Sequence, residues 1–129
     1  MTLLLDTSII VQALRQERSV LRRLAPFSPD DIVVPAVAVA ELAYGGLRSR
    51  DPARAERLWR AFIEPYAVLP FDALAAEAHA RLRLALRAQP IGERDLFIAA
   101  SAVASGSIVV TRNVGEFERV PGLTVEAWP

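Results

Sequence analysis

The amino-acid sequence predicts an α/β protein: a three-layer α/β/α sandwich built around a short, mostly parallel sheet. Two observations favour this class. Short apolar runs alternate along the chain with longer segments whose apolar residues recur at helical spacing. These runs are apolar throughout rather than alternately polar and apolar, which is typical of parallel strands that helices cover on both faces.

The chain opens with a predicted strand, Thr2–Leu5, that stops at the polar residues Asp6–Ser8. A helix follows, because the next apolar residues recur three and four positions apart. A second, short helix around Val20–Leu24 is expected to end at the Pro26–Pro29 segment, since proline cannot continue a helix.

The next strand is predicted at Ile32–Val34, and a helix over Ala36–Leu47 is expected to be closed by Gly45-Gly46. Asp51 is placed to cap a further helix. This helix is predicted over Pro52–Ile63, with proline at its first position.

The second half of the chain continues this alternation of strands and helices. Asp72 is a predicted N-cap and Gly106 a predicted helix end. In order, the predicted elements are a strand at Ala67–Leu69, a long helix ending before Pro90, a helix at Glu93–Ser105, a strand at Ser107–Val110, a helical turn at Asn113–Glu118 and a strand at Leu123–Glu126.

Length and composition limit the classes of function. A chain of 129 residues that is 53% hydrophobic fits one domain, residues 1–129, with one sizeable core. A net charge of zero argues against a protein that coats nucleic acid or a membrane surface by bulk charge. All 15 basic residues are arginine, which excludes the lysine-dependent phosphate-binding loop, Schiff-base enzymes and phosphoacceptor receiver domains. The turn after the first strand contains no glycine, which argues against a dinucleotide-binding fold.

The chain contains no cysteine and a single histidine, His79, so thiolate and histidine-rich metal sites are excluded. Its apolar N-terminal segment lacks a basic region and is interrupted by Asp6. We therefore expect no targeting segment, no membrane span and a soluble protein of the reducing cytoplasm.

Two acids occupy positions where apolar residues are expected. Asp6 directly follows the first strand, at the end where open α/β sheets bind ligands, although an N-cap role for it is equally open. Glu41 lies in the apolar segment Ala36–Tyr44, and no arginine lies within a helical turn of it. Burial of a lone carboxylate is costly, so Glu41 needs a cation or a hydrogen-bond network, or it lines a cleft.

Two more acids are candidates for the same site. Asp95 shares a helix face with Ile98, Ala99 and Ala102, although an acid in the first turn also interacts favourably with the helix dipole. Glu116 can form a capping box with Asn113, yet this segment also follows a strand end.

The four acids together indicate a metal site. In a parallel sheet they can converge on one cleft, where like charges need compensation. Oxygen ligands without cysteine or histidine select hard ions such as Mg²⁺ or Mn²⁺, which can activate water and bind a phosphodiester.

At this point the sequence resembles a known family. Four segments are similar, in order and spacing, to PIN-domain ribonucleases and, within them, to the VapC-type toxins of type II toxin–antitoxin systems; they are LLLDTSI, AVAELAYG, IGERDLFIAASAVASG and IVVTRNVGEFERVPGLTVEAWP. The resemblance covers essentially the whole chain. It implies a PIN-like α/β/α fold and a Mg²⁺- or Mn²⁺-dependent endoribonuclease. It also implies a homodimer and a small antitoxin that inserts a segment, often with an arginine, into the acidic groove.

The resemblance also implies roles for individual residues. Asp6, Glu41 and Asp95 fall on the three core acids that hold the metal and activate water. The fourth position of the site is filled by Glu116 or by Asn113, which stands where many relatives have aspartate. We favour Glu116. The polar residues expected around these acids are Thr7, Ser8, Thr111 and Asn113.

Two further expectations concern nucleic acid. Arg50, Arg54 and Arg57 share a helix face and are either a solvated surface or a track of RNA-phosphate contacts. The alternative function is a PIN-like regulatory subunit without catalysis that binds operator DNA together with a partner protein.

Overall fold

A five-stranded parallel sheet forms the centre of the protein. The computed structural model describes residues 1–129. The strands lie in the order β3-β2-β1-β4-β5, and every neighbouring pair is parallel. The strands are β1 (Leu3–Leu5), β2 (Ile32–Pro35), β3 (Ala67–Leu69), β4 (Ile108–Thr111) and β5 (Thr124–Ala127).

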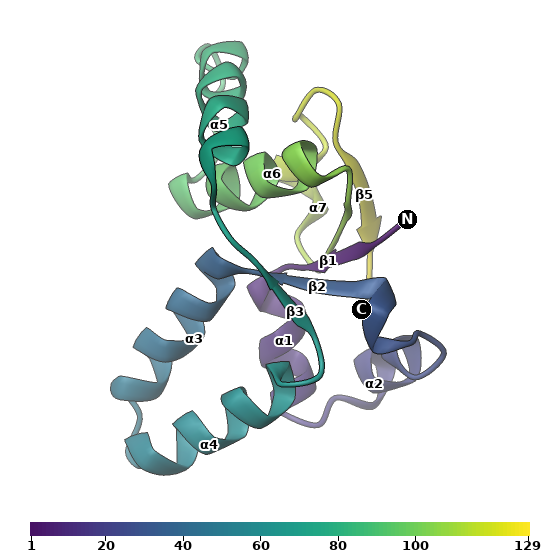
Figure 1. Ribbon diagram of the computed structural model, residues 1–129, viewed down its shortest axis with the longest axis vertical. Coiled ribbons are helices and arrows are strands. Elements are labelled where there is room, and N and C mark those ends of the chain that lie inside the picture. The colour runs from purple at the N-terminus through teal and green to yellow at the C-terminus, as the bar shows by residue number, and fades with distance from the viewer.

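Seven helices cover the sheet in two layers. They are α1 (Thr7–Leu14), α2 (Arg18–Leu24), α3 (Ala36–Leu47), α4 (Pro52–Ile63), α5 (Ala73–Ala85), α6 (Glu93–Ser105) and α7 (Val114–Phe117); a 3-10 turn, η1, spans Pro29–Asp31. Figure 1 shows α1–α4 on one side of the strands and α5–α7 on the other. The predicted three-layer α/β/α fold is confirmed.

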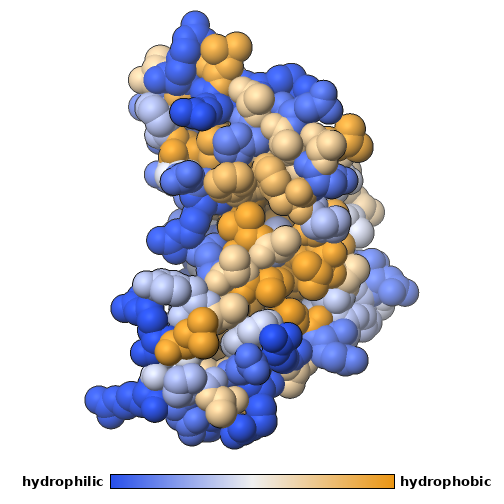
Figure 2. All heavy atoms as spheres, turned by 60° about the vertical axis from the view of Figure 1, so that its left-hand side comes forward, coloured by the Kyte–Doolittle hydropathy of each residue, from blue (hydrophilic) through white to orange (hydrophobic).

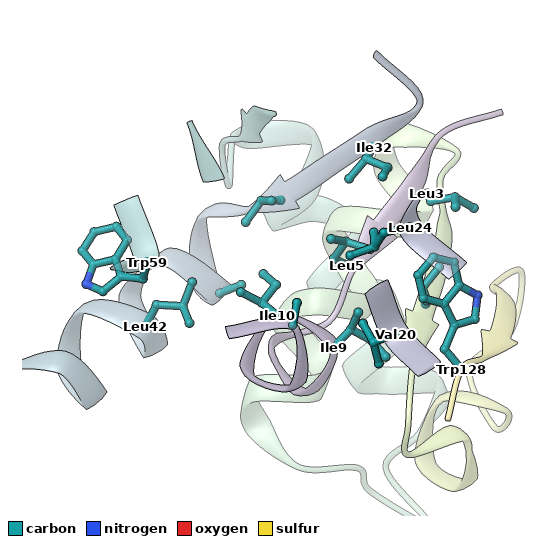
Figure 3. Packing of buried hydrophobic residues seen from close by; sticks show 14 residues of the cluster. Leu3, Leu5, Ile9, Ile10, Val20, Leu24, Ile32, Leu42, Trp59 and Trp128 are labelled. Atoms are coloured by element: carbon teal, nitrogen blue, oxygen red, sulfur yellow. The ribbon is translucent and has the colours of Figure 1, made fainter. Parts of the chain in front are cut away.

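Each face of the sheet carries its own apolar core. Because successive strand residues point to opposite faces, Leu3 and Leu5 join the core under α1–α4 and Leu4 joins the core under α5–α7. In the first core, Figure 3 shows Trp59 beside Leu42 at one end and Trp128 at the other. The apolar runs of the sequence are therefore buried on both sides, as predicted for the central strands.

The helix ends largely follow the predicted capping signals. Asp51 and Asp72 each accept a hydrogen bond from a backbone N–H in the first turn of α4 and α5. Gly106 ends α6 with a left-handed backbone, φ 69°. The predicted helix Ala36–Leu47 is confirmed as α3, but the two glycines do not form its end, because both lie within the helix and Arg48 is its C-cap. A Cβ at position 46 would stand 3.3 Å from the indole Nε1 of Trp59. Glycine at this position therefore allows α3 and α4 to approach closely.

The strands also differ in detail from the sequence prediction. β4 and β5 each begin and end one residue later than expected, β1 begins one residue later, at Leu3, and β2 extends one residue further, to Pro35. The edge strand β3 is not buried on both faces, since Ala67 and Val68 are exposed and Leu69 is half-buried. None of the helices combines the length and apolarity that a membrane crossing requires.

The strand order determines where a site can form. The chain builds β1, β2 and β3 outwards in one direction and then returns to add β4 and β5 on the other side of β1. The order therefore reverses between β1 and β4, and in such sheets ligands bind beyond the carboxyl ends of the strands at this point. Asp6 follows β1 there, and Thr111 ends β4 beside it.

Candidate functional site

An open, mostly polar cleft of about 760 Å³ lies at this reversal point. Only Val11 and Phe97 among its 12 lining residues are hydrophobic. The polar lining comes from the start of α1, the middle of α3, the start of α6 and the loop after β4: Asp6, Thr7, Ser8, Gln12, Glu41, Gly92, Glu93, Arg94, Asp95 and Asn113. Asp6, Glu41 and Asp95, predicted from separate parts of the sequence, are thus brought together.

Asp6 is held by two hydroxyl groups. Its side chain is almost fully buried, and Oδ2 accepts hydrogen bonds from Ser8 Oγ at 2.9 Å and from Thr111 Oγ1 at 2.7 Å. Although Asp6 occupies the N-cap position of α1, its carboxylate makes no capping hydrogen bond. Of the two interpretations open from the sequence, the structure therefore favours the cleft residue over the cap.

The loop after β4 keeps these hydroxyls in place. Thr111 is fully buried, and its Oγ1 accepts a hydrogen bond from the backbone N–H of Asn113 at 3.0 Å while it donates to Asp6. The backbone N–H of Arg112 donates to Ser8 Oγ at 3.4 Å. Both hydroxyls therefore have their protons directed at the carboxylate and hold it in place.

Glu41 has partners for both of its carboxylate oxygens. Thr7 Oγ1 donates to Oε1 at 2.8 Å, and Arg94 Nη1 donates to Oε2 at 2.6 Å. The Glu41 side chain is 17% exposed. The sequence predicted that this carboxylate needs a cation or a network, but the cation comes from a residue 53 positions away, at the start of α6.

Arg94 is a site residue that sequence reasoning missed. One signal could have identified it: it is the second residue of α6, between Glu93 and Asp95. A cation at a helix N-terminus interacts unfavourably with the helix dipole, so an arginine there requires a nearby acid.

Asp95 and Glu116 form a carboxylate pair at the edge of the cleft. Burial raises the pKa of Asp95 to about 7, and hydrogen bonding with Glu116 and the charges of Asp6, Glu116 and Glu41 add to the shift. Glu116 has a lowered pKa, because Asp95 and the backbone N–H of Gly92 both donate hydrogen bonds to it. The two carboxyl groups therefore titrate as a coupled pair, in which the pKa of Asp95 is raised and that of Glu116 is lowered.

The capping box that the sequence left open for this turn does not form. Asn113 stands at the N-cap of α7, but its side chain caps no backbone group. Glu116 Oε2 instead lies 3.3 Å from the backbone nitrogen of Gly92. The reason is tertiary: the loop before α6 passes close to α7 and offers Glu116 an unpaired N–H that a local cap would not satisfy.

The predicted arginine track lies elsewhere on the molecule. Arg50 precedes α4 and Arg54 and Arg57 lie on it; all three are exposed, and none of them lines the cleft. Their contact with RNA stays a prediction.

The donor chemistry of the cleft fits a hard divalent ion. Its acids offer only oxygen atoms, and the negative charges of Asp6, Glu116 and Glu41 add to the effect of burial in raising the pKa of Asp95, so a cation bound there would be favoured. No three acidic or histidine side chains stand close enough together to hold an ion as they are arranged. Binding would therefore require side-chain movement, and the ion pair between Glu41 and Arg94 is one contact that would have to change.

The fold and the acidic cleft define the class of protein. Residues 3–123 match the family model described as the PIN domain, so the chain belongs to the PIN-domain family. Within this family it is a member of the VapC group. A tRNA(fMet)-specific endonuclease VapC from Shigella flexneri is 34% identical over 127 residues, which cover 97% of this chain and 96% of that protein.

Solved structures agree with this assignment. A DNA-bound VapBC from Salmonella typhimurium matches with a TM-score of 0.94 at 30% identity, over 100% of this chain and 99% of that chain. VapBC2 from Rickettsia felis, bound to a DNA fragment from its promoter, matches with a TM-score of 0.93 at 28% identity, over 100% of both chains. The family resemblance inferred from the four sequence segments is confirmed.

Proposed function

We propose that this protein is a Mg²⁺- or Mn²⁺-dependent endoribonuclease, the toxin of a type II toxin–antitoxin pair, and that residues 1–129 act as one nuclease domain. The observation that carries the proposal is the meeting of Asp6, Glu41 and Asp95 in one open cleft, with Glu116 beside Asp95. The naming of relatives as VapC endonucleases and ribonucleases supports it.

In this proposal, Asp6 and Asp95 bind the divalent ion directly, and Glu41 and Glu116 complete or orient its ligands. When bound, the ion supplies an activated water and charge stabilisation for in-line attack on an RNA phosphodiester. Asp6 is suited to this role because its two hydrogen bonds both go to Oδ2, which leaves Oδ1 free of protein donors.

The polar residues around the acids have positioning roles. Ser8 and Thr111 orient Asp6, and Thr7 holds Glu41 through a single oxygen. Asn113 lines the cleft and braces Thr111 through its backbone N–H. Asp95 must lose its proton before it can bind an ion, so occupancy is expected to increase as the pH rises through about 7.

A homodimer and an antitoxin complete the proposal. Large apolar side chains are exposed on α3, α4, β3 and α5, and Figure 2 shows apolar atoms gathered across the middle of one face, between polar ends. Exposed apolar surface of this kind is typical of protein–protein contacts. The exposed side chains are Tyr44, Leu47, Leu58, Val68, Leu74 and Leu84.

The second candidate function is a regulatory subunit that binds operator DNA with its partner. The specific observation in its favour is that two of the solved relatives are DNA-bound complexes. A gel shift on operator DNA in the presence of the partner, with no RNA cleavage under Mn²⁺, would favour this alternative.

A cleavage assay tests the main proposal. Purified protein is incubated with total RNA in the presence of Mg²⁺, Mn²⁺ or EDTA, beside the variants Asp6→Ala and Asp95→Asn. We expect metal-dependent cleavage by the wild type and a loss of at least about 100-fold in either variant, since one group that stabilises the transition state typically contributes that much.

The matched control is Glu118→Gln, which removes an exposed acidic charge next to α7 but outside the cleft. This variant is expected to retain wild-type cleavage. Circular dichroism checks that all variants are folded. Full activity of Asp6→Ala or Asp95→Asn would contradict the assignment of the site.

A further inference from the structure

The ion pair between Arg94 and Glu41 joins an exposed cation to a largely buried carboxylate. Arg94 Nη1 lies 2.6 Å from Glu41 Oε2; the Arg94 side chain is 76% exposed, whereas that of Glu41 is 17% exposed. Glu41 projects from the middle of α3 and is also held by Thr7. Arg94 is therefore the partner that can leave without disturbing the packing.

Arg94 lies within the field of the whole acidic cleft. Its pKa is raised by the hydrogen bond and the charge of Glu41, and the charges of Asp95 and Asp6 add to this effect. Of the chain's 15 arginines, it is the one that lines the cleft. Its guanidinium therefore supplies positive charge where the acids would otherwise repel each other.

Arg94 and a divalent ion would need the same oxygen of Glu41. Thr7 occupies Oε1, and Oε2 is the atom to which Arg94 donates. The hydrogen bond from Thr7 leaves Oε2 available once the guanidinium moves away. Because the Arg94 side chain is largely exposed, water can solvate its guanidinium once it leaves, and an ion bound at Oε2 would compensate the charge of Glu41 in its place.

We propose that Arg94 is a built-in counter-ion that competes with the divalent ion for Glu41 and so weakens metal binding by the cleft. The proposal rests on the function proposed above. It assigns a role to a residue of this chain that acts before RNA binds. The expected consequence is a metal affinity set partly by the strength of the ion pair between Arg94 and Glu41.

Calorimetric titration of Mn²⁺ into the full chain without RNA tests this role directly. Wild type is compared with Arg94→Gln, which removes the charge and the Nη atoms that contact Glu41 but keeps a shorter polar side chain. We expect Arg94→Gln to bind Mn²⁺ about two- to fivefold more tightly, the change that corresponds to loss of one partly exposed ion pair.

The matched control is Arg112→Gln. Arg112 follows β4, and its backbone N–H contacts Ser8, so it lies near the cleft, but its side chain forms no ion pair with Glu41. This variant removes the same charge and reports the effect of net charge alone. Tightening by Arg94→Gln that exceeds that of Arg112→Gln supports competition at Glu41.

The remaining outcomes separate the two proposals. If Arg94→Gln binds Mn²⁺ no more tightly than wild type, or no more tightly than Arg112→Gln, competition by Arg94 is overturned and the metal site stands. If neither wild type nor Arg94→Gln binds Mn²⁺, the metal-dependent function is overturned and the role of Arg94 with it. If Arg94→Gln binds Mn²⁺ and wild type does not, the result would support both the metal site and the competition by Arg94.

Discussion

The carboxylate of Asp6 illustrates how single atoms decide a residue's role. From the sequence it could equally cap α1, and it does occupy the N-cap position. Its carboxylate instead accepts from Ser8 and Thr111, because the neighbouring strand β4 brings a buried hydroxyl within 2.7 Å. Asp6 is thereby held in the lining of the cleft.

Loss of the Thr111 hydroxyl should therefore affect both stability and activity. Thr111→Val keeps the shape of the side chain but removes the donor to Asp6 and the acceptor for Asn113 N–H. We expect a decrease in the free energy of unfolding of about 1.5–3 kcal/mol, measured by urea denaturation, and slower RNA cleavage.

Thr124→Val, on the exposed side of β5, is the control and is expected to change little. An unchanged urea midpoint for Thr111→Val would show that the bond to Asp6 contributes nothing.

The raised pKa of Asp95 predicts a specific pH dependence. Its pKa is about 7 in the folded protein, mainly through burial, against 3.8 ordinarily. Between these values the folded protein holds a proton at Asp95 that the unfolded chain has lost, so stability falls as the pH rises towards 7. Asp95→Asn removes this titration.

Urea denaturation in EDTA at a series of pH values measures the effect. The stability of wild type minus that of Asp95→Asn should decrease as the pH rises from about 5 to 7. This window lies above the ordinary pKa of 4.5 for Glu116, whose lowered pKa acts in the opposite direction only at lower pH. A difference that is flat or increases with pH would contradict the burial of a protonated Asp95.

On the scale of elements, substitution of two glycines with different backbone conformations is predicted to change stability in opposite directions. Gly106 ends α6 with φ 69°, a conformation that L-residues rarely adopt, whereas Gly45 lies in the ordinary helical backbone of α3. A Cβ at either position would meet nothing within 4 Å, so only the backbone distinguishes them.

We therefore expect Gly106→Ala to lower, and Gly45→Ala to raise, the free energy of unfolding by about 0.5–1 kcal/mol each. Thermal and urea unfolding of the two variants, side by side, measures both changes, and each variant is the control for the other. Changes of the same sign would contradict the assigned backbone conformations.

On the scale of the whole molecule, the balanced net charge hides an uneven distribution. The chain has 15 acids and 15 arginines; the site holds five of the acids (Asp6, Glu41, Glu93, Asp95 and Glu116) and one of the arginines (Arg94), which leaves 10 acids and 14 arginines elsewhere. The excess of four positive charges lies outside the site. A neutral protein can therefore bind RNA phosphates without strong nonspecific affinity.

The arginines of α4 are the proposed place for these contacts. Charge reversal at Arg54 and Arg57 should weaken RNA binding. It should also make the affinity less dependent on salt, by about 0.7 in the logarithmic slope for each phosphate that is no longer neutralised. Filter binding in EDTA at several salt concentrations measures both quantities without cleavage.

Reversal at Arg18 and Arg22, two arginines of α2 that do not line the cleft, is the control with the same change in charge. If both pairs of substitutions changed RNA binding equally, or if the α4 pair changed nothing, the prediction that Arg54 and Arg57 contact RNA phosphates would be contradicted.

Much of this protein follows from interactions that are local in the chain. Apolar periodicity predicted the strands and helices, and Asp51, Asp72 and Gly106 cap helices as their residue types require. Even the meeting of Asp6, Glu41 and Asp95 could be anticipated, because parallel strands bring their carboxyl ends to one edge.

Tertiary packing decided the rest. Arg94 pairs with Glu41 across 53 positions, and Glu116 accepts a hydrogen bond from Gly92 instead of capping α7. Gly46 lies within α3, where Trp59 of α4 packs against it. The physical reason is the range of the interactions. Periodicity and caps act within a few residues, whereas an ion pair or a close helix contact depends on where the sheet places two distant elements.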